Sequence, residues 1–362
     1  MNGFKIHGTE AAGAPPLFQA QEIDIGLRVL PLVTGKKLEL DSLTIKQPQV
    51  NVIVYPDGTT NIPHPQSILP PGVTAKNASG PSKSPLQTVM DLAIGHFNIE
   101  NGTIQFADRK IPLTARGENL RAQFSYQQSA MQYQGEISIS PLFIQDGSNP
   151  RLNVQVQAPV VVASDKIQIA NATVATPDSN LKISAKVTNL AMPQVTARVS
   201  GQVDLLEVKR TLGLSAPLNT APGVPHVLLV NAALNVPSEG SRVTTLDLGL
   251  GQSHFQAHGM FVSVAPAQGS LQFNSSFSLP ELGRLLQIPY QTAGTVQLAG
   301  NASLNGISHY SVQAALNGQK LGFQRGNLQI ENAALTSRIL ADPQKIQAEP
   351  IHLAVAGGQF NG

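Results

Sequence analysis

One phrase of sequence occurs four times and constrains the fold more than any other feature. In each copy, alternating apolar residues are followed by Gln or Asn, then by Pro, Gly or Ala, and then by a second apolar run. Apolar residues at every second position give an extended strand one apolar and one polar face. The four copies occupy residues 43–54, 97–104, 167–174 and 328–335.

The apolar positions change parity at the break in the middle of this phrase, as at Asn101-Gly102 and Asn171-Ala172. A slip of one residue would turn the following side chains to the opposite face of a sheet. An extra residue, as in a β-bulge or a tight turn, returns them to the first face. We therefore expect a break of this kind in each copy.

The same alternation continues through most of the chain. Only 13% of the residues are charged, and the chain contains 31 Gly and 26 Pro. The polar positions are mainly Gln, Asn, Ser and Thr, and this composition favours strands and turns over long helices. The sequence predicts a mainly β fold, an elongated, curled antiparallel sheet of the β-groove or taco-like kind with a few short helices.

Two segments in the C-terminal half have the spacing of a helix capping box. Asp204 is followed three positions later by Glu207, and Ser278 is followed in the same way by Glu281. Such pairs satisfy free N–H groups in the first turn of a helix. Each pair therefore predicts a short helix that caps the neighbouring strands.

The domain organisation follows from a stretch dense in Pro, Ser and Gly over 63–85, which is typical of an exposed excursion. We expect an N-terminal β-groove repeat over 1–62, a linker with a short helix over 63–93, and a continuing β-groove region over 94–362. The chain starts without a signal peptide, and a strand is expected to begin near its last residues. We therefore expect it to be a piece of a longer protein, truncated at both ends.

The residues offer little catalytic chemistry. The net charge is +2 and Lys36-Lys37 is the largest basic cluster, so we expect no nucleic-acid binding. The chain has no Cys, which excludes disulfides and thiolate metal sites. His254 and His258 would form a ligand pair on a helix, but a strand separates them by roughly 13 Å. We expect no metal, no cofactor and no enzyme activity, since no hydrolase or metalloprotease motif occurs either.

Four segments, in this order, carry a family likeness. The chain resembles the AsmA-like family of bacterial envelope proteins, which includes the TamB-like members, over nearly its whole length. The motifs are degenerate, and their order makes the likeness specific. The segments are 37–63, 94–113, 204–214 and 328–362.

The resemblance implies a periplasmic protein that an N-terminal helix anchors in the inner membrane. That helix is absent from this chain and is expected upstream. The β-rich body of such proteins resembles the repeating β-groove proteins that carry phospholipid between membranes. The implied partners are phospholipid or another acyl-chain lipid, both bacterial membranes through parts missing from this chain, and outer-membrane assembly proteins.

The strand pattern agrees with a lipid path. A sheet with one apolar face must close on itself, pack against a second sheet or curl into a trough. A trough of aliphatic side chains suits acyl chains, because burial stabilises them by about 0.8 kcal/mol per methylene without directional contacts. For each single position, ordinary core packing is the alternative. The candidate groove residues are Val50, Val52, Val54, Ile104, Phe106, Val154, Val156, Val296 and Leu298.

Two other functions fit the same strands. A scaffold or chaperone for outer-membrane protein assembly would bind its clients by strand addition at an exposed sheet edge. A secreted β-solenoid or adhesin would have coils of fixed length, and the unequal spacing of the four phrases argues against it.

Overall fold

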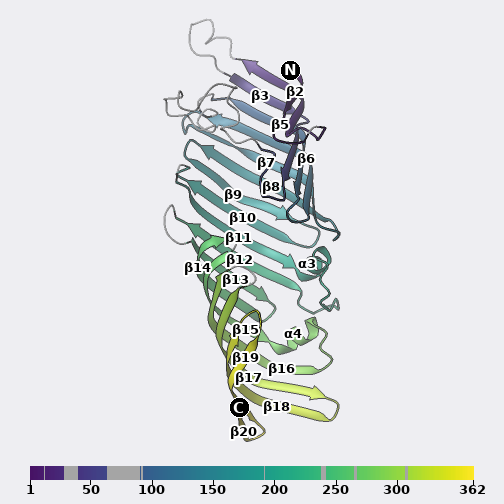
Figure 1. Cartoon of the computed structure of the whole chain (residues 1–362), viewed down its shortest axis with the longest axis vertical. Coiled ribbons are helices and arrows are strands. Elements are labelled where there is room, and N and C mark those ends of the chain that lie inside the picture. The colour runs from purple at the N-terminus through teal and green to yellow at the C-terminus, as the bar shows by residue number, and fades with distance from the viewer. Residues whose placement is uncertain are drawn as a thin grey trace. The chain divides into compact units, whose positions relative to one another are not determined.

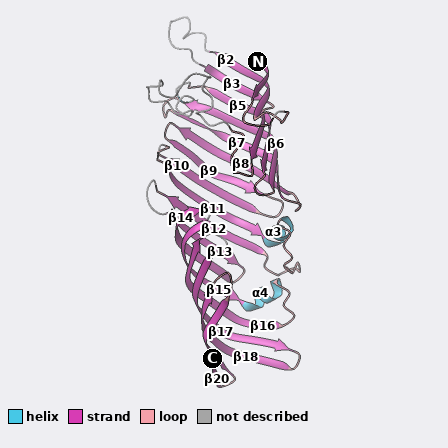
Figure 2. Cartoon of the chain, in the orientation of Figure 1, coloured by secondary structure: helices cyan, strands magenta, loops and turns pink. Residues whose placement is uncertain are grey.

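The computed structural model consists mainly of strands (Figures 1 and 2). Strands account for 69% of the residues and helices for 5%, which confirms the predicted mainly β class. The chain divides into two compact units, Met1–Pro177 (unit 1) and Asp178–Gly362 (unit 2). The residues that the structure describes are 1–11, 13–27, 40–62, 90, 93–190, 192–237, 242–264, 267–305 and 309–362.

Each unit contains one curled sheet. The strands of unit 1 are β1 (Asn2–Ile6), β2 (Phe18–Leu27), β3 (Leu40–Lys46), β4 (Gln49–Val54), β5 (His96–Asp108), β6 (Leu113–Gln127), β7 (Gln132–Asp146), β8 (Leu152–Ala163) and β9 (Lys166–Ala175).

Unit 2 contains the remaining strands and both described helices. They are β10 (Asn180–Thr188), β11 (Gln194–Asp204), α3 (Leu205–Thr211), β12 (Val227–Val236), β13 (Arg242–Leu250), β14 (Ser253–Val264), β15 (Ala267–Ser278), α4 (Leu279–Leu285), β16 (Gln291–Asn305), β17 (Tyr310–Arg325), β18 (Leu328–Ala341), β19 (Ile346–Val355) and β20 (Gly358–Asn361).

Most neighbouring strands are antiparallel, as predicted, but β5 is parallel to β3 and β4. The strands β3 and β4 form one interrupted strand that lies between β2 and β5. Parallel neighbours require a crossover connection rather than a tight turn. The crossover connection runs from Val54 to His96. His96 lies opposite Ser42, near the start of β3. Most of the expected 63–93 linker lies outside the described residues.

The predicted break is present in all four copies of the repeated phrase. At each one the Gln or Asn adopts the left-handed backbone conformation, which Asn tolerates better than most residues. In the copies on β5 and β18, the pairing with the neighbouring strand shifts register at the same place. The left-handed residues are Gln47, Asn101, Asn171 and Asn332, with φ of 47°, 53°, 54° and 54°.

A break keeps the apolar side chains on one face, as β7 shows. Ile139 and Leu142 are three positions apart, so a regular strand would turn them to opposite faces. On the neighbouring β8 their partners are Val156 and Val154, two positions apart on a regular stretch. Ile139 and Leu142 therefore share a face, although the chain between them contains a break.

In unit 1 the breaks line up across neighbouring strands. The N–H of Gln47 donates to Glu100 O at 2.7 Å, directly before the break at Asn101. On the next strand Asn119 is also left-handed, with φ of 53°, and its side-chain amide donates to Ser140 O at 2.9 Å. Because a bulge bends its strand and increases the local twist, this line forms a crease along which the sheet curls.

Unit 2 has a second crease on its last long strands. Gly294 on β16 has φ of 93° and Lys320 on β17 has φ of 50°. The register shifts between β16 and β17 and between β17 and β18 beside these residues. The fourth repeat break, at Asn332, lies on the next strand, so the same device bends the sheet in both units.

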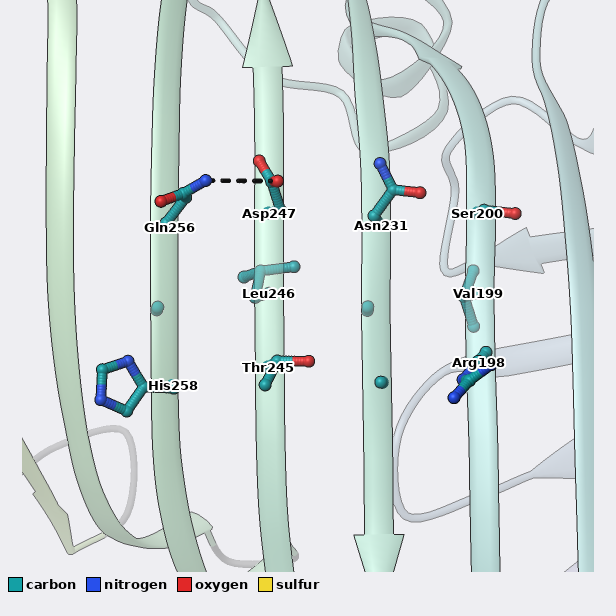
Figure 3. A pocket seen from close by; sticks show the side chains of 12 residues that line it. Arg198, Val199, Ser200, Asn231, Thr245, Leu246, Asp247, Gln256 and His258 are labelled. Carbon is teal, nitrogen blue, oxygen red and sulfur yellow. Dashed lines mark hydrogen bonds between the residues drawn. The ribbon is translucent and has the colours of Figure 1, made fainter.

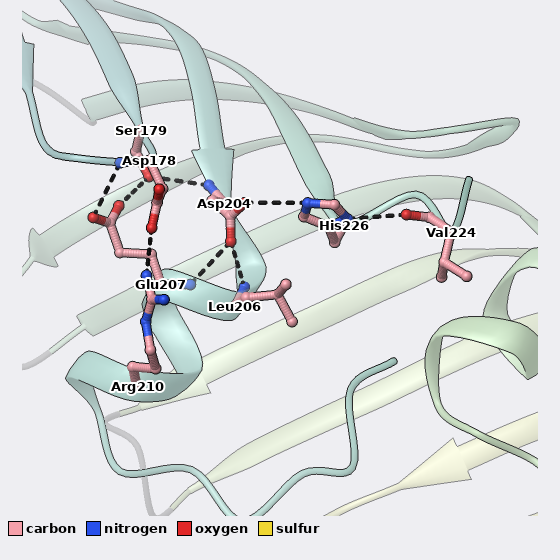
Figure 4. Close-up of polar contacts among 8 residues, drawn as sticks. All are labelled: Asp178, Ser179, Asp204, Leu206, Glu207, Arg210, Val224 and His226. Atoms are coloured by element: carbon pink, nitrogen blue, oxygen red, sulfur yellow. Dashed lines mark hydrogen bonds and ion pairs between the residues drawn. The ribbon is translucent and has the colours of Figure 1, made fainter. Parts of the chain in front are cut away.

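Both predicted helices are present, and each is tied to the start of a hairpin, as Figure 4 shows for α3. The Asp204 carboxylate accepts from the N–H groups of Leu206 and Glu207 at 2.7 and 2.9 Å. The Ser179 hydroxyl accepts from the Asp204 N–H at 3.0 Å and donates to the Glu207 carboxylate. Ser179 directly precedes β10. This network therefore joins the start of the β10–β11 hairpin to α3, the helix that follows the hairpin.

The second helix repeats the link to the hairpin, but the side-chain cap expected from Ser278 is not formed, because the Ser278 side chain makes no capping hydrogen bond. Ser253, at the start of β14, accepts from the N–H of Ser278 at 3.0 Å. The carboxylate of Glu281 accepts from the N–H of Gln252 at 2.8 Å. The segments β10–β11–α3 and β14–β15–α4 are therefore two copies of one hairpin–helix module. The sequence likeness at the capping boxes marks only the end of this longer repeat.

We predict that Asn332→Val destabilises the protein by about 1–2 kcal/mol, because a β-branched residue is strained in the left-handed region. Asn332→Gly should be close to neutral, since Gly adopts that region freely. Urea unfolding measures the difference. The control is Ala334→Val, at an exposed position of the same strand. Equal stability of the two Val variants would contradict the assigned role of the break.

We predict that Ser179→Ala lowers the free energy of unfolding by about 1–2 kcal/mol, since it leaves the Asp204 N–H without the hydroxyl that it donates to. Ser253→Ala should cost a similar amount in the second module. Thermal and urea unfolding measure both effects. Ser215→Ala, at an exposed position between α3 and β12, is the matched control. If it destabilises the chain as much as Ser179→Ala, the capping role is wrong.

Candidate functional site

Unit 2 carries a continuous apolar face. Residues directly opposite each other in a ladder lie on the same face of the sheet. Following these partners from strand to strand gives a row that crosses β10 to β18 and contains no polar side chain. Its members are Ile183, Val199, Ala232, Leu246, Ala257, Phe273, Gly300, Ala314 and Ile339.

The neighbouring row on the same face is almost as apolar, with serine as its only polar side chain. The rings of Phe255 in this row and Phe273 in the first are stacked, with centroids 5.9 Å apart. The two rows together make a broad aliphatic surface. The second row consists of Leu181, Gly201, Val230, Leu248, Phe255, Ser275, Leu298, Leu316 and Ser337.

The opposite face of the same strands is polar. Figure 3 shows Arg198, Thr245 and His258 on this face, at positions adjacent in sequence to residues of the apolar rows. Gln256 donates to Asp247 at 3.4 Å on this side. The two faces therefore differ sharply in chemistry, as the alternating sequence predicts.

The apolar face is the enclosed side of the curl. Ala314 on β17 is 5% exposed, whereas Ala315, the next residue, is exposed. Ala333 and Ala334 on β18 differ in the same way. Because the members of each pair have the same side chain, the contrast reports the face and not the residue type.

This enclosure does not seal the face. Among the described residues of unit 2, the buried apolar side chains larger than alanine are Val224 and Leu285, and neither lies on a strand. Leu246 and Leu298, in the middle of the apolar rows, stay half-buried. In this unit no second sheet packs on the apolar face among the described elements. The face is therefore an open trough.

Unit 1 has an aromatic cavity on its apolar face. Its volume is about 270 Å³, and it is lined by apolar side chains and Tyr133. The Tyr133 hydroxyl accepts from the N–H of Ile94 at 2.7 Å, and burial raises the pKa of the Tyr133 phenol. The phenol therefore stays neutral and presents its ring to the cavity. The lining residues are Leu43, Ile94, Phe97, Phe124, Tyr133 and Val162.

The nine groove residues proposed from sequence all lie on the apolar faces. Val50 and Val52 pair with Ile104 and Phe106 in unit 1, and Val54 follows on the same face. Val154 and Val156 pair with apolar residues of β7, while Val296 and Leu298 lie on β16 in unit 2. Val154 is only 3% exposed, so at that position ordinary core packing holds. Whether the others contact a ligand stays a prediction.

None of these nine residues lines the aromatic cavity, which the sequence reasoning missed. A signal was present, since aromatic residues make up only 5% of the chain. Phe97 and Phe124 are opposed partners, and Tyr126 and Tyr133 also pair, with ring centroids 5.1 Å apart. The concentration of rings on β5 to β7 could have located the cavity.

The buried carboxylates of unit 2 serve to order the backbone. The buried carboxylates Asp204 and Glu207 belong to the cap of α3, and Asp204 lies 3.4 Å from His226 Nε2 (Figure 4). His254 and His258 both lie on β14, as expected for a strand. In the described ranges, no three His, Asp or Glu side chains are grouped to hold a metal ion.

Comparison with known proteins adds no assignment. None of the described helices is both long and apolar enough to cross a membrane. No protein-family model, no curated protein and no solved structure matches this chain.

Proposed function

We propose that the chain carries phospholipid along the apolar faces of its curled sheets. The observation that supports this most directly is the pair of apolar rows across β10 to β18, on which no second sheet packs among the described elements of unit 2. A large apolar surface that is exposed to water is rare in a soluble protein unless an apolar partner binds to it. Acyl chains match it, because they need apolar contact and no hydrogen bonds.

The dimensions of the face also favour acyl chains. Neighbouring strands lie about 4.8 Å apart, so the rows from β10 to β18 extend over roughly 40 Å. Each methylene removed from water is stabilised by about 0.8 kcal/mol, and an acyl chain on this surface gains that contact at any position. Because no single contact dominates, the chain can slide from strand to strand, which transport requires.

The aromatic cavity of unit 1 suits the end of one such chain. Apolar cavities of about 150 Å³ lined by similar residues stay dry and bind small hydrocarbons, and this cavity is larger, at about 270 Å³. Under this proposal an acyl end occupies the space between Phe97, Phe124 and Tyr133 while the headgroup remains in water.

The cellular setting follows from the resemblance to the AsmA-like family. We place the chain in the bacterial periplasm, held at the inner membrane by a helix upstream of this sequence, with lipid moving between the inner and outer membranes. A role as a scaffold for outer-membrane protein assembly would use a sheet edge and not the apolar face. Its clients would therefore compete poorly with bound lipid.

We predict that Leu246→Asp combined with Leu298→Asp slows the transfer of a fluorescent phospholipid between vesicles by about tenfold or more. A carboxylate in the middle of the apolar face raises the free energy of an acyl chain lying there. Mass spectrometry of the purified wild-type protein should detect bound phospholipid, and the variant should carry less of it.

The matched control is Thr245→Asp with Gln297→Asp, which places the same charges on the polar face of the same strands. Transfer by this control should equal that of the wild-type protein. Thermal unfolding checks that both variants fold. Wild-type protein that neither binds nor transfers phospholipid would refute the proposal, and so would full activity of the apolar-face variant.

A further inference from the structure

A depression on the polar face of unit 1 is lined by three arginines and by no carboxylate. Its volume is about 400 Å³. Arg109 comes from the turn after β5, Arg116 from β6, and Arg151 from the residue before β8. The rest of the lining includes polar neutral residues such as Asn51 and Gln105 and apolar residues such as Phe143. The net charge of +2 for the whole chain makes this local concentration of positive charge unusual.

Strand register brings the three arginines together. Asn51, Gln105 and Arg116 are successive partners on β4, β5 and β6, so they share the polar face. The end of β5, the start of β6 and the end of β7 are paired with one another, and β8 starts beside the end of β7. Arg109 and Arg151 therefore emerge at the same end of these strands, on either side of Arg116.

Contacts hold two of the three guanidinium groups in place. The guanidinium of Arg109 lies over the ring of Tyr55, 5.7 Å from its centroid. The Nε of Arg151 donates to Gln145 Oε1 at 3.2 Å, and the Gln145 amide donates in turn to Asn149 O at 3.1 Å. These contacts leave the terminal nitrogens of Arg151 for another acceptor. Neither Arg109 nor Arg151 pairs with a carboxylate among the described residues.

Some other cations on the polar faces have a carboxylate beside them. Lys46 lies 3.3 Å from Glu22 and 2.9 Å from Asp24, and the hydrogen bond to Asp24 raises the pKa of Lys46. In unit 2 a depression of about 500 Å³ contains Arg198 together with Asp247 (Figure 3). Arg116 has Glu118 at 3.2 Å, but Glu118 does not line the depression. The depression of unit 1 thus groups three arginines with no carboxylate in its lining, whereas the lining of the depression in unit 2 includes Asp247.

We propose that this depression binds a phosphate-bearing anion. The guanidinium fork matches phosphate oxygens in pairs, and phosphate offers more oxygens and more charge than a carboxylate for three such groups. A volume of about 400 Å³ accommodates the phosphate together with the group esterified to it. A lipid headgroup and a soluble phosphate ester share this chemistry. The proposal concerns the polar face of unit 1 and does not depend on lipid transfer along the apolar faces.

The test measures binding of inorganic phosphate to the full chain by calorimetry at low salt. We expect saturable binding that weakens roughly tenfold for each arginine replaced by glutamine, because each charge-assisted contact is lost. The variant with Arg109→Gln, Arg116→Gln and Arg151→Gln together should show no binding. Arg198→Gln, in the depression of unit 2, is the control and should bind like the wild-type protein.

Vesicles distinguish the two sources of phosphate. Binding to phosphatidylcholine vesicles that contain phosphatidic acid, but not to phosphatidylcholine alone, supports a lipid headgroup if the triple variant loses it. Binding of inorganic phosphate without vesicle binding supports a soluble phosphate ester. The proposal is overturned if the wild-type protein binds neither probe or if the triple variant binds as well as the wild-type. It is also overturned if an oligoglutamate peptide competes for the depression as strongly as inorganic phosphate does. That result would indicate that the ligand is an acidic polypeptide.

The variants on the two faces keep the proposals apart. Loss of phosphate binding in the triple variant leaves the apolar rows intact, so phospholipid transfer reports on them separately. The Leu246→Asp and Leu298→Asp variant should retain phosphate binding, because its substitutions lie in unit 2.

Discussion

The fold depends on long strands that bend and still keep their apolar side chains on one face of the sheet. A long strand in a curled sheet must bend. A shift of one residue in the alternation would turn the following side chains to the other face of a regular strand. At the break of each repeated phrase a left-handed residue resolves this conflict, as at Asn101 and Asn332. The extra residue bends the strand and returns the apolar side chains to the same side. The open apolar trough of unit 2 depends on this backbone device.

The sequence predicted the features that are local in the chain. The strand class, the four breaks and the two short helices are each determined by residues a few positions apart, so periodicity and capping spacing were sufficient. The parallel pairing of β5 with β3 was not predicted. It depends on where the chain re-enters the sheet after leaving β4, and the alternation along β5 does not specify the direction of its neighbours. The link between Ser179 and the cap of α3 also escaped prediction, because its partners are far apart in sequence.

The candidate surfaces were predictable to different degrees. The apolar faces followed from alternation, and the proposed groove residues lie on them. The aromatic cavity and the arginine depression require strand register, which no single strand specifies. Phe97 and Phe124, like Arg116 and Gln105, become neighbours only once β5 and β6 are aligned across the shifted register at the break. A register error of one residue would have moved each of them to the wrong face.

The separation of chemistry between the two faces bears on how such a sheet could work. Apolar contacts on one face are non-directional and interchangeable from strand to strand, so they hold a ligand without fixing its position. The arginines on the other face of unit 1 are the opposite case, since they hold a charge at one point through directional hydrogen bonds. A single sheet thus combines a surface suited to movement with a site suited to capture. Because β5 and β6 carry both, any ligand that distorts one face must also alter the strands that form the other.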